Sequence, residues 1–389
     1  MSGPILPGAT LGVMGGGQLG RMFIHAAQRM GYFTAVLDPD AASPAGRVSH
    51  HHIVAEYLDA PGLGQLAETC DAITTEFENV PSSALARLAV YTTVSPAASA
   101  VAIAQDRAAE KAHFLRCGVP CAPYAVIDTP EQLAAVDEAL LPGILKTTRL
   151  GYDGKGQARV ADRAALAAAW ADMKNVPCVL EKMLPLAAEC SVIVARGADG
   201  QMVHLPIQRN LHRDGILAVT EVLEFYEENM PAAQVASALE AAKSIANGLQ
   251  YVGVLCVEFF VLQDGSLVVN EIAPRPHNSG HASMDCCDVS QFELQVRTLT
   301  GLPLVQPRQH SPAIMLNLLG DLWFLRSAQA ATPPWAEVLA LPGAHLHLYG
   351  KASASKGRKM GHLTLTGPTA SAVRATALQA AALLGIEAF

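Results

Sequence analysis

The most informative stretch of this sequence is Gly253-Val-Leu-Cys-Val-Glu-Phe-Phe-Val-Leu-Gln-Asp-Gly-Ser-Leu-Val-Val-Asn-Glu-Ile272. Its two apolar runs predict antiparallel strands, and Asp264-Gly265 between them favours a two-residue hairpin turn. Counting outward from that turn places Glu258 directly opposite Glu271 on one face. Like charges in this arrangement destabilise a hairpin. The pair therefore indicates either two solvated glutamates or a divalent cation, and Mg²⁺ held by carboxylates and substrate phosphates fits the second reading.

The composition excludes several classes of protein. The chain has 389 residues, 51% of them hydrophobic, and a net charge of −8. Its length allows two or three domains, and its acidity argues against a nucleic-acid binder with a broad basic face. The Ala-rich stretch 164–171 is bounded by Arg163 and Asp172, so no membrane span is expected. The N-terminus lacks the basic region of a signal peptide, and the eight cysteines contain no Cys-x₂-Cys pair. We therefore expect reduced cysteines and a cytoplasmic location.

The order of predicted elements suggests three domains. Residues 10–38 alternate strand, glycine turn, helix and strand, and further strands at 72–75 and 90–94 continue the pattern, which is typical of an open parallel α/β (Rossmann-like) sheet. One helical stretch is expected over 99–117. Short strands, a long helix and the hairpin then indicate an α+β unit, and the tail carries strand-like runs and an Ala-rich helix. The predicted domains are 1–110, 111–305 and 306–389. The expected strands and helices of the last two are 142–146, 178–182, 191–195, 232–249, 313–318, 344–349 and 361–365.

A glycine turn follows the first predicted strand. Gly15-Gly-Gly-Gln-Leu-Gly20 opens a helix, and Asp38 ends the next strand, which is the pattern of a dinucleotide site. Physically, the turn requires only free backbone N–H groups and a helix N-terminus, which hold any anion. A purely structural turn, a dinucleotide and a substrate phosphate all remain open from this motif, and the later motifs favour the substrate phosphate.

A second glycine-rich segment follows an apolar strand that ends in Lys146. Gly151-Tyr-Asp-Gly-Lys-Gly-Gln157 is a phosphate-sized loop, and the lysine before it supplies a fixed positive charge. The Walker pattern is absent. Glu181-Lys-Met-Leu184 closes another strand, whose edge is suited to hydrogen-bonding a purine, and Glu189 is suited to ribose hydroxyls. Taken singly, these last residues also fit a plain surface.

Two further segments carry clustered polar residues. Ile272-Ala-Pro-Arg-Pro-His-Asn-Ser-Gly-His281 follows the second hairpin glutamate, and polar loops beside a metal site are commonly functional. Lys351-Ala-Ser-Ala-Ser-Lys-Gly-Arg-Lys-Met-Gly-His362 places four basic residues together in an acidic chain. We interpret this tail loop as a clamp on an anionic substrate rather than as a solvated surface loop.

Together these motifs resemble the ATP-grasp superfamily and, within it, the 5-(carboxyamino)imidazole ribonucleotide synthetases. The resemblance spans nearly the full length. It also includes Thr75-Glu-Phe-Glu-Asn-Val-Pro81 and Asn210-Leu-His-Arg-Asp-Gly-Ile216. One departure is Thr75, where this family usually has an aromatic residue. The resemblance implies an ATP-grasp fold with a small C-terminal β-rich domain. It also implies that the protein is a homodimer.

The resemblance also implies a reaction and its residues. ATP and bicarbonate form carboxyphosphate, which carboxylates 5-aminoimidazole ribonucleotide to the N-carboxyaminoimidazole ribonucleotide with release of ADP and phosphate, in de novo purine biosynthesis. Glu258 and Glu271 are the implied ligands of Mg²⁺, or of Mn²⁺ in its place. The implied ATP-binding residues are Arg107, Lys146, Gly151, Tyr152, Asp153, Gly154, Lys155, Gly156, Gln157, Glu181, Lys182, Met183, Leu184, Glu189, His212, Asn270 and Glu271. The implied substrate-binding residues are Gly17, Gln18, Leu19, Glu76, Arg275, His277, Asn278, Lys351 and Arg358, and the implied catalytic residues are Asp153, Arg275, His277 and Lys351.

The expected chemistry leaves some choices open. Asp153 and His277 are both candidates for the base that takes the proton of the exocyclic amine. The nearest alternative function is that of a formate-dependent glycinamide ribonucleotide transformylase, which shares the nucleotide site. An NAD-dependent dehydrogenase built on residues 15–38 and a non-catalytic ATP-sensing module are the other rivals. The expected partners are small molecules, with no nucleic acid and no membrane.

Overall fold

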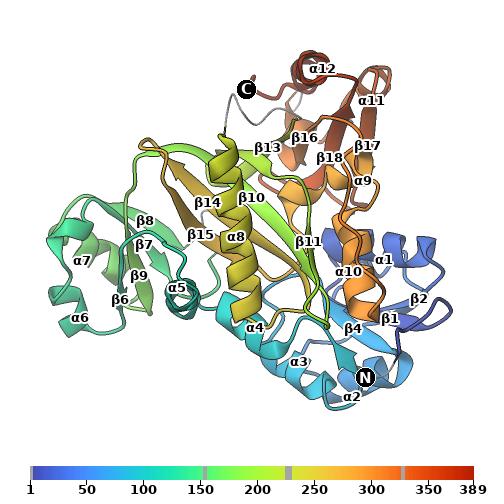
Figure 1. The fold of residues 1–389 in the computed structure, drawn as a ribbon, viewed down its shortest axis with the longest axis horizontal. Coiled ribbons are helices and arrows are strands. Elements are labelled where there is room, and N and C mark those ends of the chain that lie inside the picture. The colour runs from blue at the N-terminus through green and yellow to red at the C-terminus, as the bar shows by residue number, and fades with distance from the viewer. Residues whose placement is uncertain (1–2, 152–155, 224–229, 326–328) are drawn as a thin grey trace.

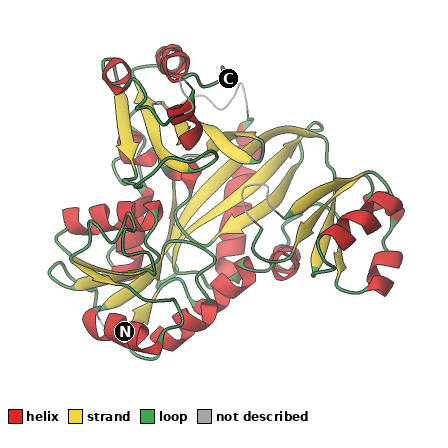
Figure 2. Ribbon diagram, turned by 180° about the vertical axis from the view of Figure 1, so that it is seen from behind, coloured by secondary structure: helices red, strands yellow, loops and turns green. Residues whose placement is uncertain are grey.

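The computed structural model describes residues 3–151, 156–223, 230–325 and 329–389. It contains three β-sheets with helices packed around them (Figure 1). The N-terminal sheet and the C-terminal strands lie at opposite ends of one side of the molecule, and a small sheet with its own helices projects from the other side (Figures 1 and 2). Within the described residues, none of the helices combines the length and apolar character needed to cross a membrane.

The N-terminal sheet is parallel and has the order β3-β2-β1-β4-β5. The predicted parallel α/β arrangement is therefore confirmed. The expectation missed β3, a three-residue strand too short to show a pattern. It also made β5 too long, because Val90 and Tyr91 are 76% and 79% exposed and lie outside the sheet. The elements are β1 (Thr10–Met14), α1 (Gln18–Arg29), β2 (Phe33–Leu37), β3 (His51–Ile53), α2 (Ala60–Thr69), β4 (Ala72–Thr75), α3 (Ser82–Leu88) and β5 (Thr93–Val94).

The predicted single helix over 99–117 is wrong. The chain forms α4 (Ala98–Ala104) and then α5 (Arg107–Arg116), with a break at Gln105 and Asp106. The Asp106 carboxylate accepts hydrogen bonds from the Ala108 and Ala109 N–H groups, so it caps the second helix. The break gives α5 its own direction, and this helix lies against the functional cavity.

The small projecting sheet is antiparallel, with the order β6-β9-β7-β8. Leu145, Leu180 and Trp170 belong to its separate apolar core. Because β9 lies inside this sheet, its backbone is not the free edge that we predicted for residues 181–182. The elements are β6 (Tyr124–Ile127), α6 (Pro130–Ala134), β7 (Gly143–Thr147), β8 (Gln157–Val160), α7 (Arg163–Asp172) and β9 (Cys178–Lys182).

The largest sheet is antiparallel and includes the C-terminal strands. Its order is β15-β14-β10-β12-β13-β16-β18-β17, with β11 beside β10. The C-terminal strands thus extend the central sheet through the β13–β16 pairing instead of forming a sheet of their own. The strands are β10 (Leu186–Arg196), β11 (Met202–His204), β12 (Gln208–Arg213), β13 (Ile216–Val222), β14 (Gly253–Leu262), β15 (Leu267–Ala273), β16 (Ala313–Leu319), β17 (Ala344–Leu348) and β18 (Lys359–Thr366).

Helices join these layers. The long α8 (Ala232–Gly248) buries Ala238, Ala242 and Ile245 against the outer face of the central sheet. Helix α10 (Gln291–Thr300) packs between the central and N-terminal sheets, and one core cluster contains Phe292 of this helix and Phe23 of α1. The remaining helices are α9 (Ser283–Cys286), α11 (Trp335–Leu339) and α12 (Ala370–Leu384). The central sheet therefore has one face under α8, while its other face is partly covered by α10 and partly lines a cavity.

Candidate active site

A cavity of about 930 Å³ lies where the three sheets meet. Its walls come from the glycine turn, α5, β7, the β14–β15 hairpin and the C-terminal strands. The predicted residues that line it are Gln18, Leu19, Glu76, Arg107, Lys146, Gly151, Gln157, Glu189, His212, Glu258, Asn270, Glu271, Arg275, His277 and Asn278. Tyr152, Asp153, Gly154 and Lys155 lie outside the described residues. The structure thus brings residues from most of the predicted motifs to one cavity.

The hairpin places Glu258 opposite Glu271 as predicted, but by a different path. The Leu262 N–H donates to the Ser266 carbonyl, which leaves a three-residue loop at 263–265 instead of the two-residue turn. Gly265 has φ +82°, as this longer loop requires. Phe259 pairs with Val269, and a register shift between Glu258 and Phe259 restores the predicted pairing of Glu258 with Glu271. The turn prediction was therefore wrong, and a β-bulge at Asn270 compensates for it.

The bulge has a consequence for the cavity. Asn270 is the unpaired residue of the bulge, between Val269 and Glu271, and both Asn270 and Glu271 line the cavity. A bulge re-aims side chains in this way. The Asn270 Oδ1 atom is buried and has no hydrogen-bond partner among the described residues. Two carboxylates and an unsatisfied amide oxygen form a hard oxygen donor set, which suits Mg²⁺.

Both hairpin carboxylates also have a basic partner. The Glu258 Oε1 atom lies 2.9 Å from His277 Nε2, and the Glu271 Oε2 atom lies 3.1 Å from Arg107 Nη1. Burial alone would raise the pKa of Glu258, but the His277 imidazole and other nearby basic groups lower it to about 2. Glu258 is therefore ionised at neutral pH although it is buried.

Helix α5 contacts both the β14–β15 hairpin and the small projecting sheet. The sequence analysis missed two of its residues, Glu110 and Lys111. Lys111, which is 1% exposed, lies 3.1 Å from Glu181 Oε1, while Lys146 Nζ lies 3.0 Å from Glu181 Oε2. Glu110 accepts the Ile272 N–H at 2.7 Å, and burial, together with the nearby Glu271 carboxylate, raises the pKa of Glu110 to about 8. The i, i+3 and i+4 spacing of 107, 110 and 111 places these side chains on one helix face, and this spacing was the signal available in the sequence.

The glycine turn does not have the free N–H groups that we expected. The Gly16 N–H donates to Asp38 Oδ2 at 2.7 Å, and the Gly17 and Gly20 N–H groups donate to the two carboxylate oxygens of Glu76. Burial raises the pKa of Glu76 to about 7, although the two backbone N–H groups oppose this shift. Protein carboxylates thus hold the donors that were assigned to a substrate phosphate, and Gln18 and Leu19 face the cavity beside them.

The loop after β15 is held by several contacts. Arg275 pairs with Glu78, which the sequence analysis did not single out, and Arg275 lowers the pKa of Glu78 to about 2 against the effect of burial. His277 Nδ1 lies 2.9 Å from the Ser279 hydroxyl oxygen, which fixes the ring with Nε2 toward Glu258. Asn278 is 7% exposed, and its amide has no hydrogen-bond partner among the described residues. This amide is therefore available to a bound molecule.

The tail loop lies near the cavity, but not as predicted. Lys351 Nζ donates to the Lys359 carbonyl at 2.6 Å, and the exposed Arg358 donates to the Ser353 carbonyl at 3.0 Å. Lys359 and Tyr349 line the cavity instead, and neither was predicted. Several other predicted residues lie outside the cavity lining, namely Gly17, Gly156, Glu181, Lys182, Met183, Leu184, Lys351 and Arg358.

Family models match three consecutive parts of the chain. They are the ribonucleotide synthetase preATP-grasp domain over residues 8–105, the ATP-grasp domain over 112–292 and the phosphoribosylaminoimidazole carboxylase C-terminal domain over 313–376. The fold and the carboxylate-lined cavity where the three sheets meet thus define an ATP-grasp ligase.

Full-length relatives narrow the class further. The chain is 44% identical to N5-carboxyaminoimidazole ribonucleotide synthase of Brucella melitensis over 93% of this chain and 97% of that protein. It resembles the ADP complex of the Staphylococcus aureus synthetase with a TM-score of 0.88, 37% identity and coverage of 98% and 99%. It also resembles the Aspergillus clavatus synthase in complex with ADP and 5-aminoimidazole ribonucleotide, with a TM-score of 0.86, 32% identity and coverage of 97% and 98%. The chain belongs to the N5-carboxyaminoimidazole ribonucleotide synthase family, which confirms the resemblance seen in the sequence.

Proposed function

We propose that this cavity carries out the reaction of the family with the residues described above. The chain uses ATP and bicarbonate to carboxylate the exocyclic amine of 5-aminoimidazole ribonucleotide, with release of ADP and phosphate, in purine biosynthesis. The observation that carries the assignment is that the two hairpin glutamates and Lys146 line one cavity, with Lys146 held from behind by the buried Glu181, which also pairs with Lys111. Bicarbonate is a weak electrophile, so ATP must activate it as carboxyphosphate.

Glu258, Glu271 and Asn270 are the proposed ligands of Mg²⁺. When bound, this ion neutralises negative charge on the transferring phosphoryl group. His277 and Arg107 already lie against these carboxylates, and both side chains line the cavity. These basic side chains explain how the two facing carboxylates are tolerated in the folded chain. A bound Mg²⁺ would compete with them for the same carboxylate oxygen atoms.

Lys146 and Arg107 are the proposed cations for the ATP phosphates. Lys146 is buried and held by Glu181, and Arg107 is held by Glu271, so both charges are positioned before the nucleotide binds. Positioned donors stabilise charge that develops in a transition state without a reorganisation cost. Glu181 through Leu184 and Glu189 with His212 remain the proposed contacts to the adenosine part. The loop 151–157 remains a proposed contact to the ATP phosphates.

Glu76, Arg275, His277, Asn278 and the tail loop are the proposed contacts to the ribonucleotide and bicarbonate. Gln18 and Leu19 face the same region. His277 is suited to accept the amine proton because its ring is held by Ser279 on one side and faces the cavity on the other. Asp153 stays an alternative base that lies outside the described residues.

The experiment is a measurement of ADP release with each combination of acceptor and one-carbon donor. We expect ADP release that requires bicarbonate and is stimulated by 5-aminoimidazole ribonucleotide, with a carbamate product that traps labelled bicarbonate. Stimulation by formate and glycinamide ribonucleotide instead would show the transformylase reaction. ATP binding without turnover on either ribonucleotide would show a sensing module.

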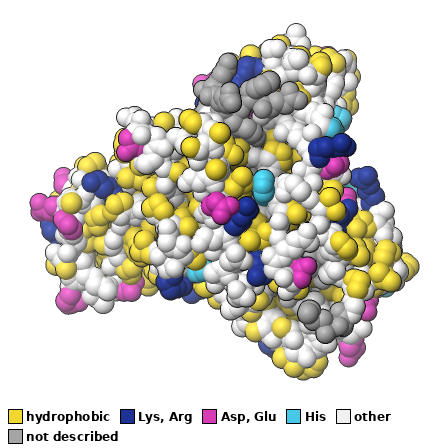
Figure 3. Space-filling view, viewed as in Figure 1, with side chains coloured by type: hydrophobic (Ala, Val, Ile, Leu, Met, Phe, Trp, Pro, Cys, Tyr) yellow, Lys and Arg dark blue, Asp and Glu magenta, His cyan; other side chains and the backbone are white. Residues whose placement is uncertain are grey.

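The proposal also includes the domain boundaries, the oligomeric state and the cellular location. We propose domains at 1–110, 111–305 and 306–389, a homodimer in solution and a cytoplasmic location. Positive and negative side chains are interspersed over the face seen in Figure 3, which fits small-molecule partners. Sedimentation at several protein concentrations tests the dimer, and limited proteolysis tests the boundaries.

A further inference from the structure

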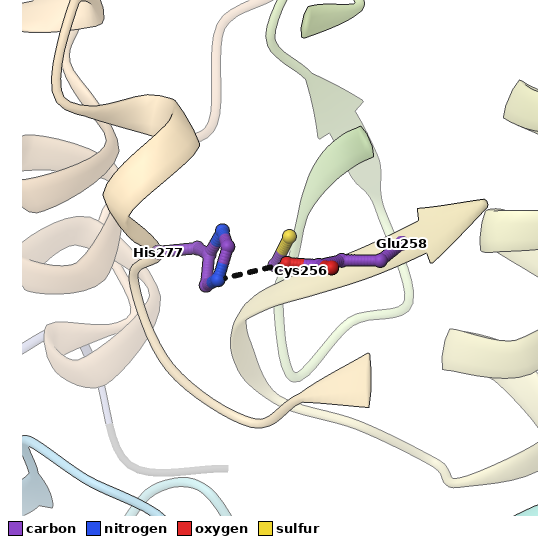
Figure 4. Close-up of side chains that lie close together, drawn as sticks. All are labelled: Cys256, Glu258 and His277. Atoms are coloured by element: carbon purple, nitrogen blue, oxygen red, sulfur yellow. Dashed lines mark ion pairs between the residues drawn. The ribbon is translucent and has the colours of Figure 1, made fainter. Parts of the chain in front are cut away.

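A cysteine lies behind the hairpin glutamates, on the same strand face as Glu258. Cys256 and Glu258 are two residues apart on β14, so their side chains point to the same side of the sheet. Val257 and Phe259 belong to the apolar core on the opposite side. His277 reaches this face from the loop after β15 and points toward Glu258, with Cys256 beside them (Figure 4).

These three side chains form a compact donor set. One ligand atom from each of Cys256, Glu258 and His277 lies within 4.8 Å of the other two. The ligands of a tetrahedral zinc ion lie roughly 3 to 4 Å from one another, with bonds of about 2.0–2.3 Å. Small side-chain rotations therefore close the set around an ion, and the cavity that Glu258 and His277 line offers the fourth position to water.

The surroundings of His277 support this arrangement. Its Nδ1 atom accepts the Ser279 backbone N–H at 3.3 Å and lies 2.9 Å from the hydroxyl oxygen of the same residue, which is fully buried and also bonded to Ser191. Metal-binding histidines commonly hydrogen-bond through their second ring nitrogen, which fixes the ring orientation. On binding, the thiol proton leaves to the solvent and the imidazole proton moves from Nε2 to Nδ1, where the Ser279 hydroxyl oxygen accepts it in place of the hydrogen bond from the Ser279 N–H.

We propose that Cys256, Glu258 and His277 form a site for a thiophilic divalent cation such as Zn²⁺, distinct in donor set from the two-carboxylate Mg²⁺ site. Thiolate and imidazole ligands select zinc and cobalt, whereas Mg²⁺ prefers oxygen. Because Glu258 belongs to both sites, an ion bound here removes a Mg²⁺ ligand and immobilises His277. Zinc bound at this site therefore inhibits turnover, and this last step rests on the proposed function.

Cobalt binding tests the site without reference to activity. The protein without nucleotide is titrated with Co²⁺, and the near-ultraviolet charge-transfer band of thiolate-bound cobalt is recorded for the wild type, C256A, C256S and C190A. Cys190 is a matched control, since it is a buried cysteine on the neighbouring β10 that packs into the opposite core. We expect the band in the wild type and in C190A, and its loss in both Cys256 variants. No band in the wild type, or a band that persists in C256A and C256S, overturns the site.

Zinc inhibition tests the consequence. Cys256 has no part in the proposed catalytic machinery, so C256A should turn over normally without zinc. The Zn²⁺ concentration that halves turnover should rise at least about tenfold in C256A, because loss of even an outer partner of a metal ligand costs about 10- to 100-fold in affinity. It should stay unchanged in C190A, and added Mg²⁺ should compete with zinc. If the cobalt band depends on Cys256 but zinc does not inhibit the wild type, the site stands and the role of Glu258 in turnover is overturned.

Discussion

The nucleotide side and the ribonucleotide side of the cavity satisfy their charged groups in different ways. On the nucleotide side, each predicted carboxylate faces a basic side chain from another element, as Glu271 faces Arg107 and Glu181 faces Lys146. On the ribonucleotide side, Arg275 pairs with Glu78, but the backbone donors of the glycine turn end on Glu76 and Asp38, and the basic tail residues donate to backbone carbonyls.

The difference indicates how each side meets its ligand. The nucleotide side holds its charges in place before ATP binds. When ATP binds, its phosphates therefore replace a carboxylate as the partner of each basic side chain. The ribonucleotide side has carboxylates at the positions suited to a phosphate, so an anion must compete with Glu76 for the same donors. We therefore expect substitutions on the first side to lower turnover and substitutions on the second side to weaken ribonucleotide binding.

The largest effect is expected for Glu271→Gln. Loss of a metal carboxylate leaves phosphoryl charge uncompensated, and turnover should fall roughly 100- to 1,000-fold, as when one positioned donor is removed from a transition state. Arg107 loses its partner, so the free energy of unfolding should fall by up to about 1 kcal/mol, since this ion pair is partly exposed. Steady-state kinetics over a range of Mg²⁺ and chemical denaturation measure both quantities.

Glu240→Gln is the matched control for this variant. Glu240 lies on α8 with its side chain 74% exposed and paired with Lys243, away from the cavity lining. Its turnover should match the wild type. Normal turnover of Glu271→Gln at ordinary Mg²⁺ would contradict the metal assignment on the nucleotide side.

The second expected effect is on the ribonucleotide side, in the tail loop. If Arg358 reaches the substrate phosphate, Arg358→Ala loses a charge-assisted contact of about 1.5–3 kcal/mol, which raises the ribonucleotide KM about 10- to 150-fold. Lys351→Ala should act in the same direction, and the KM for ATP should barely change. Arg308→Ala is the control, because Arg308 is an exposed arginine outside the cavity lining. Unchanged ribonucleotide KM values in both tail variants would show that this loop is a solvated surface loop with no part in substrate binding.

A smaller effect is expected in the glycine turn. A Cβ atom at Gly20 would lie 2.7 Å from the Gly15 carbonyl oxygen, so Gly20→Ala must displace the turn that carries the Glu76 contacts. Overpacking of this kind costs about 1–3 kcal/mol, and we expect the ribonucleotide KM to rise up to about tenfold. Gly64→Ala, in α2, meets no atom within 4 Å and controls for the substitution itself. A rise in the KM for ATP alone would reverse the assignment of the two sides.

The smallest expected effect is a pH-dependent one on the nucleotide side. Burial lowers the pKa of His212, but the Glu189 carboxylate at 2.7 Å raises it more, so the folded pKa lies above the model-peptide value of 6.5. A raised histidine pKa stabilises the fold below the unfolded pKa, and this stability disappears as the pH rises through the folded pKa. Glu189→Gln should therefore lower the free energy of unfolding by up to about 1 kcal/mol below about pH 6.5 and by less at higher pH.

A double-mutant cycle with His212→Gln isolates this pair. The coupling free energy between the two positions should shrink as the pH rises. A coupling that stays constant with pH would show that the two side chains interact by packing and not through the charge of His212.

Local signals in the sequence were sufficient for most of the strands. Ala72–Thr75 and Cys178–Lys182 are strands with the predicted bounds, because each is a short run rich in apolar or β-branched residues that ends at a clear polar signal. His51–Ile53 was missed because three residues cannot show a period. The break at Asp106 was missed because Ala-rich segments on both sides hide a capping residue between them.

The missed site residues share a physical cause. Glu78 contacts Arg275 from 197 positions away, and Glu110 contacts Ile272 from 162 positions away. Partners this far apart are brought together by the packing of whole sheets, which no local pattern encodes. The hydrogen bonds from the glycine turn to Glu76 were missed for the same reason, since Glu76 follows the end of a different strand, β4.

The two irregularities of the β14–β15 hairpin have one more consequence. Between Glu258 and Glu271, the chain is equally long whether it forms a three-residue tip with a bulge or a two-residue tip with one more pair. The three-residue tip pairs Phe259 with Val269, and both are buried in the apolar core, whereas the two-residue tip would place the polar Asn270 opposite Phe259. Core packing therefore selects the bulged hairpin, and mutations at Asp264 or Gly265 should change the tip while this packing keeps the two glutamates aligned.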